Sequence, residues 1–265
     1  MSDVLAGCYV ISLRPAGQHA AMRRAAHGFG ARVLALSPWR LRMRDDAAAR
    51  AQLGAALDCE CVLFTSPAAV RAAAALQPLR ARGGQDWCAV GSATARAVQR
   101  AGVAHVVAPS RMDSEGVLSL AALGDPARRV GLVTAPGGRD LVETLLAARG
   151  TPLVRADVYA REPIALSPRA VARLVALHAP RWLALSSGAA LERALSQLPA
   201  SARARLLESR VVASSDRLAR LARAQGFAAI TLAGGPRPRD LLAAAAADAS
   251  ASMPGDSFPE RPSAP

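Results

Sequence analysis

The 265-residue sequence contains no lysine and no asparagine, so all 33 of its basic side chains are arginine. We attribute the missing lysine to coding bias, but its absence has chemical consequences whatever the cause. A chain without lysine forms no lysine Schiff base and has no P-loop lysine for a phosphate. Its net charge of +13 rests on guanidinium groups, which grip carboxylate or phosphate with two hydrogen bonds at once. The composition therefore favours an anionic partner.

Aromatic residues are also few: four phenylalanines, three tryptophans and two tyrosines. The arginines are spread singly along expected helical faces, and so few rings offer little base stacking, so we expect no nucleic-acid partner. A small acidic ligand fits the pattern better. No run of about 18 uncharged apolar residues occurs, so no membrane span or membrane partner is expected.

Cysteine and histidine are too few and too scattered to suggest a metal site. Cys59 and Cys61 form one close pair, which lacks a second cysteine or histidine pair at zinc-ligand spacing. We expect all four cysteines to be buried or free thiols, no metal, and a cytoplasmic location. The histidines are isolated in the sequence, so each is expected to be an ordinary surface or core residue. They are His19, His27, His105 and His178.

Short aliphatic runs alternate with amphipathic runs of ten or so residues, which indicates an α/β protein with largely parallel sheets. The expected strands are residues 8–13, 32–36, 61–64, 87–90, 105–107, 130–134, 153–160, 181–185, 211–213 and 228–232. From Pro254 onward the sequence is rich in proline and has no periodicity. Residues 251–265 are therefore expected to form a disordered tail.

Several segments of the first half return in the second half at a nearly constant interval. Three matched pairs are Ser66 with Ser187, 121 residues apart (187 − 66), Pro15 with Pro136, also 121 apart, and Gly30 with Gly150, 120 apart. A further match between alanine-rich helices, 95–103 with 219–227, is discounted because such helices match one another cheaply. The repeat predicts two similar α/β domains with a groove between them, and the function is expected there.

Small polar residues follow the expected strands at five places. These are Thr65–Ser66–Pro67, Gly91–Ser92–Ala93–Thr94, Ala135–Pro136–Gly137–Gly138, Ser186–Ser187–Gly188 and Ser214–Ser215–Asp216. Ligands of open α/β sheets bind beyond the carboxyl ends of the strands, and helix N-termini with free N–H groups attract anions. Helix capping alone explains any single one of these segments. Five facing the same way favour a ligand for some of them.

Taken in order, the motifs resemble those of the uroporphyrinogen-III synthase family over roughly residues 8–247. The matching stretches are "LRP", "LSPWRL", "FTSPAAV", "VGSATARAVQRAG", "MDSEGVLSL", "GGRDLVETLLAARG", "VYARE", "LALSSGAALERAL" and "VVASSDRLARLARAQGF". No single motif is diagnostic, but their order forms a specific set. Trp39 is a departure, because a smaller aliphatic residue would be more usual there.

The resemblance implies an α/β fold of two similar parallel-sheet, Rossmann- or flavodoxin-like domains joined by a two-stranded antiparallel ladder. Domain one would be discontinuous, with residues 1–38 and 164–250, and domain two would span residues 44–156. The connecting strands would be residues 39–43 and 157–163. Two thin linkers would allow hinge motion, which suits a site that closes on a bulky substrate.

The resemblance also implies the reaction, which is the cyclisation of hydroxymethylbilane to uroporphyrinogen III with loss of water and inversion of the last ring, in haem or sirohaem biosynthesis. The substrate is a linear tetrapyrrole with eight carboxylates, so it agrees with the arginine-rich composition. No cofactor is required. The protein is expected to act as a monomer, with a transient contact to the preceding enzyme of the pathway.

Tyr159 is the expected catalytic residue, as a proton donor or hydrogen-bond donor to the departing hydroxyl. A packed aromatic at the ladder is the alternative for it, and a solvated surface role is the alternative for each arginine. The expected substrate-binding residues are Arg14, Ser66, Gly91, Ser92, Thr94, Gly138, Arg139, Ser187, Ser214 and Arg217.

Two other functions remain open from the sequence. A non-catalytic two-domain binding protein for a small anion would share the same groove. A dinucleotide-dependent oxidoreductase is a weaker rival, because no G-x-G-x-x-G follows a strand.

Overall fold

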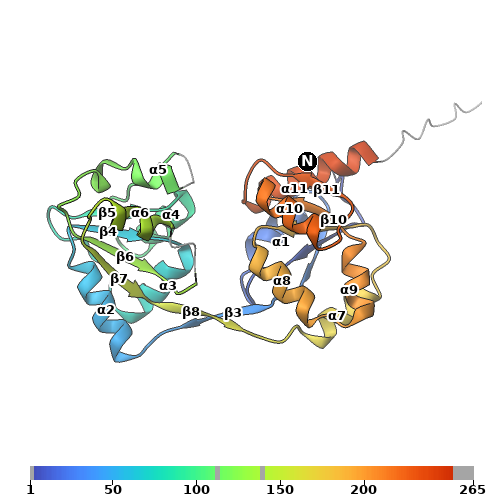
Figure 1. Cartoon of the computed structure of the whole chain (residues 1–265), viewed down its shortest axis with the longest axis horizontal. Coiled ribbons are helices and arrows are strands. Elements are labelled where there is room, and N and C mark those ends of the chain that lie inside the picture. The colour runs from blue at the N-terminus through green and yellow to red at the C-terminus, as the bar shows by residue number, and fades with distance from the viewer. Residues whose placement is uncertain (1–2, 111–113, 138–140, 253–265) are drawn as a thin grey trace, which may run out of the picture. The chain divides into compact units, whose positions relative to one another are not determined.

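The structure of the protein is a computed structural model that describes residues 3–110, 114–137 and 141–252 (Figure 1). The chain divides into two compact units. Unit 1 comprises Met1–Arg40 and Pro163–Pro265, and unit 2 comprises Leu41–Glu162. Each unit has its own parallel sheet, so the α/β fold class expected from the sequence is confirmed.

Unit 1 is built on five parallel strands in the order β11-β10-β9-β1-β2. Tyr9 of β1 pairs with Arg32 of β2 on one side and with Arg181 of β9 on the other. The chain order therefore reverses between β1 and β9, which is where ligands of such sheets bind. The strands are β1 (Tyr9–Ser12), β2 (Arg32–Ala35), β9 (Arg181–Leu185), β10 (Arg210–Ala213) and β11 (Ile230–Leu232).

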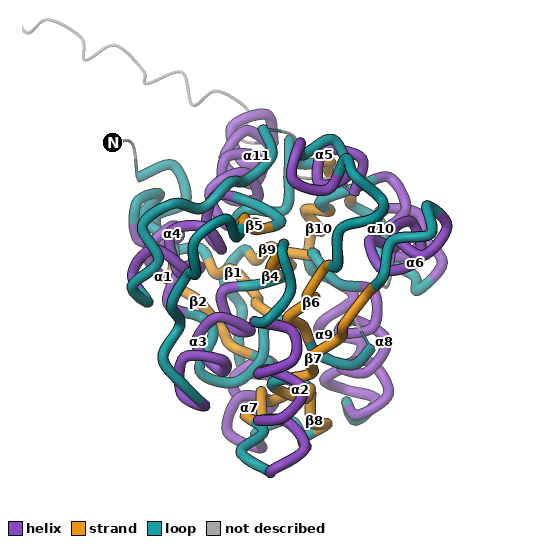
Figure 2. The backbone as a smooth tube through the Cα atoms, turned by 90° about the vertical axis from the view of Figure 1, so that its left-hand side faces the viewer, coloured by secondary structure: helices purple, strands orange, loops and turns teal. Residues whose placement is uncertain are grey.

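Helices cover both faces of this sheet (Figures 1 and 2). Ile11 and Leu183 pack on one face against α7 (Pro168–Val175), α8 (Gly188–Gln197), α9 (Ala200–Leu207) and α10 (Asp216–Ala224). Val10 and Trp182 pack on the other face against α1 (Ala20–His27) and α11 (Pro238–Ser252). Successive strand residues point to opposite faces, so the strands are apolar on both. Residues 251 and 252 end α11, and the rest of the expected tail lies outside the described residues.

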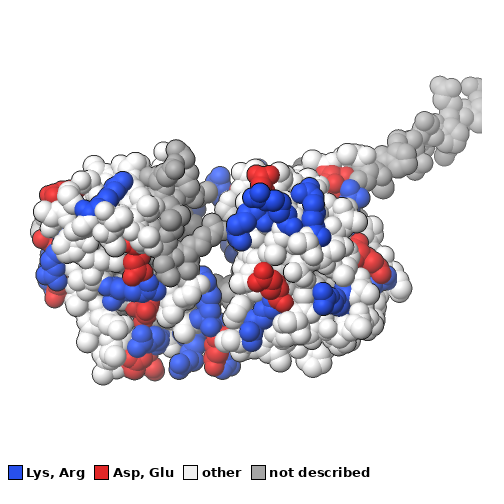
Figure 3. Space-filling model, viewed as in Figure 1, with Lys and Arg blue, Asp and Glu red and all other residues white. Residues whose placement is uncertain are grey.

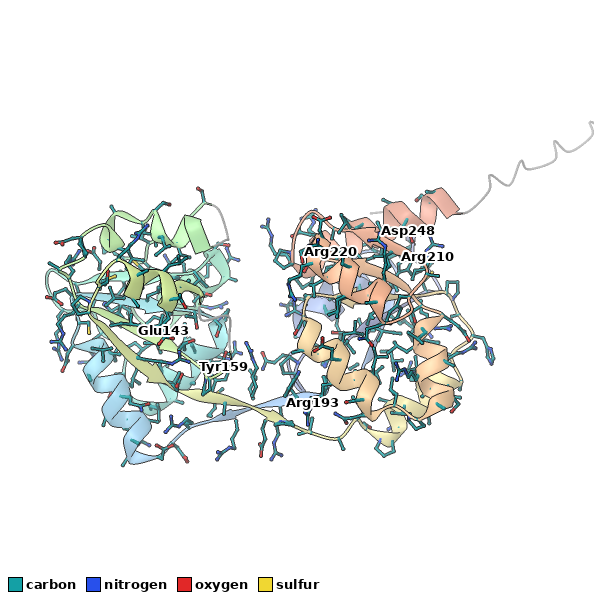
Figure 4. The ribbon with its side chains drawn as sticks, in the orientation of Figure 1. Glu143, Tyr159, Arg193, Arg210, Arg220 and Asp248 are labelled. Carbon is teal, nitrogen blue, oxygen red and sulfur yellow. The ribbon has the colours of Figure 1, made fainter. Side chains whose placement is uncertain are left out.

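Asp248 ties α11 to the sheet of unit 1. Its carboxylate accepts hydrogen bonds from Trp182 Nε1 at 2.8 Å, Thr231 Oγ1 at 3.0 Å and Arg210 Nη2 at 2.7 Å. Figure 4 shows Asp248 and Arg210 close together at this helix. The hydrogen bonds, that of Arg210 foremost, lower the pKa of Asp248, because each favours the charged carboxylate.

Unit 2 is built on four parallel strands in the order β5-β4-β6-β7. Val107 adds one isolated parallel bridge to Cys88 on the outer side of β5, so the expected strand 105–107 is reduced to a single paired residue. The strands are β4 (Cys61–Phe64), β5 (Asp86–Ala89), β6 (Val130–Thr134) and β7 (Leu153–Asp157).

Unit 2 is also a three-layer body. Val62 and Phe64 pack on one face of the sheet against α2 (Ala47–Leu57), α3 (Pro67–Leu76) and α4 (Ser92–Arg100). Leu63 packs on the other face against α5 (Ser114–Leu118), the 3-10 helix η1 (Ala121–Leu123) and α6 (Leu141–Ala148). Gly131 of β6 permits the close approach of α2, because a Cβ there would overlap the carbonyl oxygen of Ala56.

The two sheets repeat one another strand by strand. In sheet order, β10, β9, β1 and β2 of unit 1 correspond to β5, β4, β6 and β7 of unit 2, and β11 corresponds to Val107. The first residues of β1 and β6 are 121 apart (130 − 9), and so are those of β2 and β7 (153 − 32). The register is also kept, because Tyr9 pairs with Arg32 as Val130 pairs with Leu153. The similarity of the two domains inferred from the sequence is confirmed.

Strands β3 (Trp39–Met43) and β8 (Tyr159–Pro163) form a separate two-stranded sheet. The N–H of Arg44 donates to the carbonyl of Val158, and the N–H of Ile164 donates to the carbonyl of Pro38, so the pair is antiparallel. The sequence predicts a single strand over residues 153–160, but the strand is interrupted at Val158, where the chain passes from the sheet of unit 2 to the two-stranded sheet. The N–H of that buried residue still bonds to Thr134 at the end of β6, while its carbonyl already belongs to the ladder. For this reason the second connecting strand starts at Tyr159 rather than at residue 157.

Within the described ranges, no helix is long and apolar enough to cross a membrane.

Candidate functional site

Ser66 and Tyr159 form a side-chain contact at the strand ends of unit 2. Ser66 follows β4 and caps α3, where its Oγ accepts the N–H of Ala69 at 3.0 Å and Pro67 occupies the first turn. Tyr159 opens β8, and its Oη lies 3.2 Å from Ser66 Oγ. Its side chain is 4% exposed and packs in the apolar core of unit 2, and Figure 4 shows it beside the strand end. The structure thus brings together two residues that the sequence singles out.

The hydrogen-bond inventory of this hydroxyl pair leaves one proton for a ligand. Each hydroxyl has one proton to donate, and the bond between them uses one of the two. Ser66 Oγ already accepts from the N–H of Ala69, and no further acceptor for either hydroxyl is found among the described residues. Whichever hydroxyl donates within the pair, the other keeps a proton that can be donated outward.

The end of β5 lies beside that of β4 and carries the next three expected residues. Gly91 is the N-cap of α4 and is buried, and its carbonyl accepts the N–H groups of Thr94 and Ala95. Among the described residues no side chain caps this helix, so its positive N-terminus has no hydroxyl bonded to it. Ser92 is exposed, whereas Thr94 is 3% exposed and belongs to the first turn of α4 rather than to the loop that precedes it.

The end of β6 is held by backbone and hydroxyl contacts. Thr65 Oγ1 donates to Thr134 Oγ1 at 2.9 Å and joins the ends of β4 and β6. Arg161 Nη1 donates to the carbonyl of Gly137 at 3.0 Å, which places a guanidinium on the loop that follows β6. The expected residues Gly138 and Arg139 lie outside the described residues. Glu143 of α6, which Figure 4 labels, forms an ion pair with Arg155.

In unit 1 the ends of β9 and β10 bring together Ser187, Ser214 and Arg217. Ser187 is the exposed N-cap of α8, and its Oγ accepts the N–H of Ala190 at 3.3 Å. Ser214 follows β10, and its N–H donates to the carbonyl of Leu185 at the end of β9. Arg217 lies in the first turn of α10, with its Nη1 3.7 Å from the position that a Cβ on Gly188 would take. Its guanidinium therefore lies against the N-terminus of α8, where an anion would meet both.

Arginine dominates the exposed surface of α10. Arg217, Arg220 and Arg223 are all exposed, and within the described part of the chain no carboxylate lies within ion-pair distance of any of them. Figure 3 shows a basic cluster over this helix, in the view of Figure 1, and Figure 4 marks Arg220 in it. A concentration of like charge attracts anions.

The end of β1 carries Arg14 and a histidine that the sequence does not single out. Arg14 is half-buried, its Nε is buried without a partner among the described residues, and burial lowers the pKa of its guanidinium. His19 precedes α1 and is 5% exposed, with its Nδ1 3.0 Å from Ser12 Oγ and its Nε2 2.7 Å from Ser37 Oγ. Burial, with the charges of Arg23 and Arg14, lowers the pKa of His19 to about 4, so the ring is neutral at pH 7.

Sequence reasoning treats His19 as an ordinary histidine, and it misses this chain of three side chains. The available signal was positional. Ser12 and Ser37 each stand at or just beyond the end of a strand, and His19 opens the helix after "LRPAGQ". Their proximity follows from the pairing of β1 with β2, which no local pattern states.

The four cysteines, Cys8, Cys59, Cys61 and Cys88, are free and buried, as the sequence predicts. Cys61 and Cys88 lie on adjacent strands with their Sγ atoms 3.9 Å apart. In the ranges that the structure describes, no three His, Cys, Asp or Glu residues converge in a way that would hold a metal ion.

Comparisons with known proteins agree with this architecture. The model of the family described as uroporphyrinogen-III synthase HemD matches residues 20–243. Among solved structures, a mutant uroporphyrinogen III synthase from the extremely thermophilic bacterium Thermus thermophilus is similar with a TM-score of 0.57 and 19% identity, covering 93% of this chain and all of that one. The uroporphyrinogen-III synthetase of Helicobacter pylori is similar with a TM-score of 0.56 and 14% identity, covering 90% of this chain and 98% of that one.

None of the curated proteins compared with the chain is a match. At these identities the two structures support the fold, while the family match spans most of the sequence and supports the function. The chain belongs to the uroporphyrinogen-III synthase family.

Proposed function

We propose that the Ser66–Tyr159 pair and the strand-end residues of both units carry out the reaction of this family in this chain. Members of the family cyclise hydroxymethylbilane, as lyases of tetrapyrrole biosynthesis. Loss of the terminal hydroxyl as water leaves an electrophilic methylene on the first ring. The substituted carbon of the last ring attacks this methylene and forms a spiro intermediate, which rearranges with that ring inverted. The ring carbon that finally closes releases a proton, so one water is lost overall.

The proton that leaves with the hydroxyl comes, in this proposal, from the pair of hydroxyls in unit 2. The observation that carries the assignment is the 3.2 Å contact between Tyr159 Oη and Ser66 Oγ. Since the phenol ring is buried and the serine half-buried, we assign delivery to the two together rather than to Tyr159 alone. The buried core around the ring fixes the position of the donor, as a general acid requires.

Binding of the eight substrate carboxylates is assigned to guanidinium groups and helix N-termini. Arg14 and Arg217 supply charge, and the N-termini of α3, α4, α8 and α10 supply N–H groups next to Ser66, Gly91, Ser92, Ser187 and Ser214. Thr94 lies in the same turn as Gly91 and is assigned with it. Gly138 and Arg139 stay in the proposal on the strength of the sequence alone.

The proposed catalytic role is tested by Tyr159→Phe with Tyr9→Phe as its matched control. Tyr9 is the other tyrosine of the chain, also buried, with its hydroxyl bonded by Arg173 instead of a strand-end serine. We expect Tyr159→Phe to lower kcat at least about tenfold and to raise the share of isomer I, because spontaneous closure then competes. Tyr9→Phe should keep both values. An unchanged kcat and isomer ratio in Tyr159→Phe would refute the assignment.

Other properties belong to the same proposal. We infer that the chain works as a monomer in the cytoplasm, which is consistent with its four free thiols, and that it contacts the preceding enzyme transiently. We also infer that residues 1–38 with 164–250, and residues 44–156, are its two domains. Gel filtration with light scattering and limited proteolysis test the first and the last of these statements.

A further inference from the structure

Arg193 and Trp39 form a stacked pair in unit 1. The guanidinium of Arg193, in the second turn of α8, lies 4.8 Å from the centroid of the Trp39 indole, which is a cation–π distance (Figure 4 labels Arg193). Trp39 opens β3 and is partly buried against the core of unit 1.

The charge of Arg193 is not matched by any acidic group in the part of the chain that the structure describes. Its Nε is buried without a hydrogen-bond partner, and its terminal nitrogens are neither buried nor bonded to a described residue. One turn along α8, Gln197 turns its Oε1 to the N–H of Leu166 at 2.8 Å, so that oxygen is already engaged. Half-buried guanidinium groups normally find carboxylates or carbonyls, so this group has an unused donor edge.

The pair lies at the carboxyl edge of the unit 1 sheet, where the expected substrate-binding residues are. The carbonyl of Trp39 accepts the N–H of Ala16 at 2.8 Å, which fixes the loop that follows β1 and carries Arg14. Helix α8 starts at Ser187, directly after β9, so Arg193 projects from within two turns of a strand end. Arg193 thus lies toward the same edge of the unit 1 sheet as Arg14 and Ser187.

We propose that Arg193 binds a carboxylate of the linear tetrapyrrole and that Trp39 is the positioning residue that holds its guanidinium ready. The inference rests on the proposed function, and adds two residues to it. Stacking on the indole leaves the edge of the planar guanidinium outward, and that edge matches a carboxylate in two parallel hydrogen bonds. Trp39 removes much of the freedom of a long side chain before the ligand arrives, so less is lost on binding.

The test is steady-state kinetics on enzymatically generated hydroxymethylbilane, with kcat and KM determined separately. Arg193→Gln should raise KM about tenfold and leave kcat within about twofold, because a charge-assisted contact to a part of the substrate remote from the reacting carbon is lost. Arg203→Gln is the matched control. Arg203 is an exposed arginine of α9 with no assigned role, and its loss changes the net charge equally. We expect the control to keep the KM of the parent.

Trp39 is tested through a double-mutant cycle. Trp39→Leu should raise KM about threefold and Trp39→Phe less, because the phenyl ring keeps part of the cation–π contact. In the Arg193→Gln background, Trp39→Leu should have no further effect on KM, since Trp39 acts through Arg193. Additive effects would show that Trp39 acts in another way and would overturn its positioning role.

Loss of folding is separated from loss of binding by thermal unfolding of every variant. Where Arg193→Gln melts early, Arg193→Lys keeps the charge without the planar fork, and its KM should still rise several-fold. A KM for folded Arg193→Gln and Arg193→Lys equal to that of Arg203→Gln overturns the proposal. The proposed function fails on a different result, which is a parent protein that makes no isomer III.

Discussion

The hydrogen bond between Ser66 and Tyr159 predicts a difference in stability between two serines that the internal repeat makes equivalent. Ser66 and Ser187 both follow a central strand, and both cap the next helix through the N–H three residues on. Ser66 alone has a tyrosine hydroxyl at 3.2 Å. Ser66→Ala and Ser187→Ala therefore remove equivalent helix caps. Ser66→Ala also leaves the nearly buried hydroxyl of Tyr159 without its hydrogen-bond partner.

The expected magnitudes follow from these contacts. Loss of a serine N-cap costs about 1 kcal/mol, which is the whole effect expected for Ser187→Ala. Leaving a buried hydroxyl without its partner costs roughly 1–3 kcal/mol more, so Ser66→Ala should cost about 2–4 kcal/mol of the stability of unit 2. In a Tyr159→Phe background that excess should disappear, and Ser66→Ala should again cost about 1 kcal/mol.

Urea unfolding can report each unit separately through its own tryptophan. Trp87 is buried in unit 2 and Trp182 in unit 1. Replacing Trp39 and Trp182 by phenylalanine leaves Trp87 as the reporter of unit 2, and replacing Trp39 and Trp87 leaves Trp182 for unit 1. Equal losses for Ser66→Ala and Ser187→Ala, or an unchanged loss in the Tyr159→Phe background, would refute the reasoning.

Three further predictions concern stability. The folded-state pKa of His19, about 4, lies below its ordinary value of 6.5, so the stability that neutral His19 gives unit 1 is complete above pH 6.5 and is lost as the pH falls to about 4. In His19→Gln, the urea midpoint reported by Trp182 should therefore depend less on pH between 6.5 and 4. An equal pH dependence of the midpoint in parent and variant would contradict this. Gly131→Ala should destabilise unit 2 by about 1–3 kcal/mol, because the new Cβ meets the backbone of Ala56. Gly54→Ala in α2 should stabilise unit 2 by about 0.5–1 kcal/mol, because no atom of the described residues lies within 4 Å of the new Cβ. The urea midpoint reported by Trp87 must therefore move in opposite directions for the two variants. Asp248→Ala should lower the free energy of unfolding of unit 1 by about 3 kcal/mol, because Arg210, Trp182 and Thr231 lose their shared acceptor. The parent should lose the same stability as the pH falls below 3.8 and through the lowered pKa of Asp248. A loss of less than about 1 kcal/mol, reported by Trp182 fluorescence, would count against the network.

Much of the fold was predictable because the residues that recur in the repeat lie at strand ends and turns. Proline, glycine and serine at matched positions mark where strands stop and helices start, and those positions proved equivalent in the two sheets. The break between β7 and β8 at Val158 was not predictable, because residues 153–160 contain no proline or glycine that would end a strand. The break is imposed by two hydrogen bonds of Val158 to different sheets, which is a tertiary effect.

The candidate residues were chosen from the sequence one at a time, and their contacts with one another could not be predicted from it. Ser66 and Tyr159 stand 93 residues apart, and their hydroxyls meet only because β8 starts beside the end of β4. Thr94 looked like a loop residue after a strand, yet the uncapped start of α4 takes it into the first turn and buries it. The Ser12–His19–Ser37 chain and the Arg193–Trp39 stack depend on strand order and helix packing. Spacing along the sequence predicts neither of these two arrangements.

The central claim, that this chain directs ring closure of hydroxymethylbilane, is tested most directly by product analysis. Hydroxymethylbilane is generated enzymatically in the presence of the protein, the products are oxidised to porphyrins, and the isomers are separated. The account predicts predominantly isomer III with the parent protein and a rising share of isomer I with Tyr159→Phe. Isomer I alone, at the rate seen without protein, would contradict it.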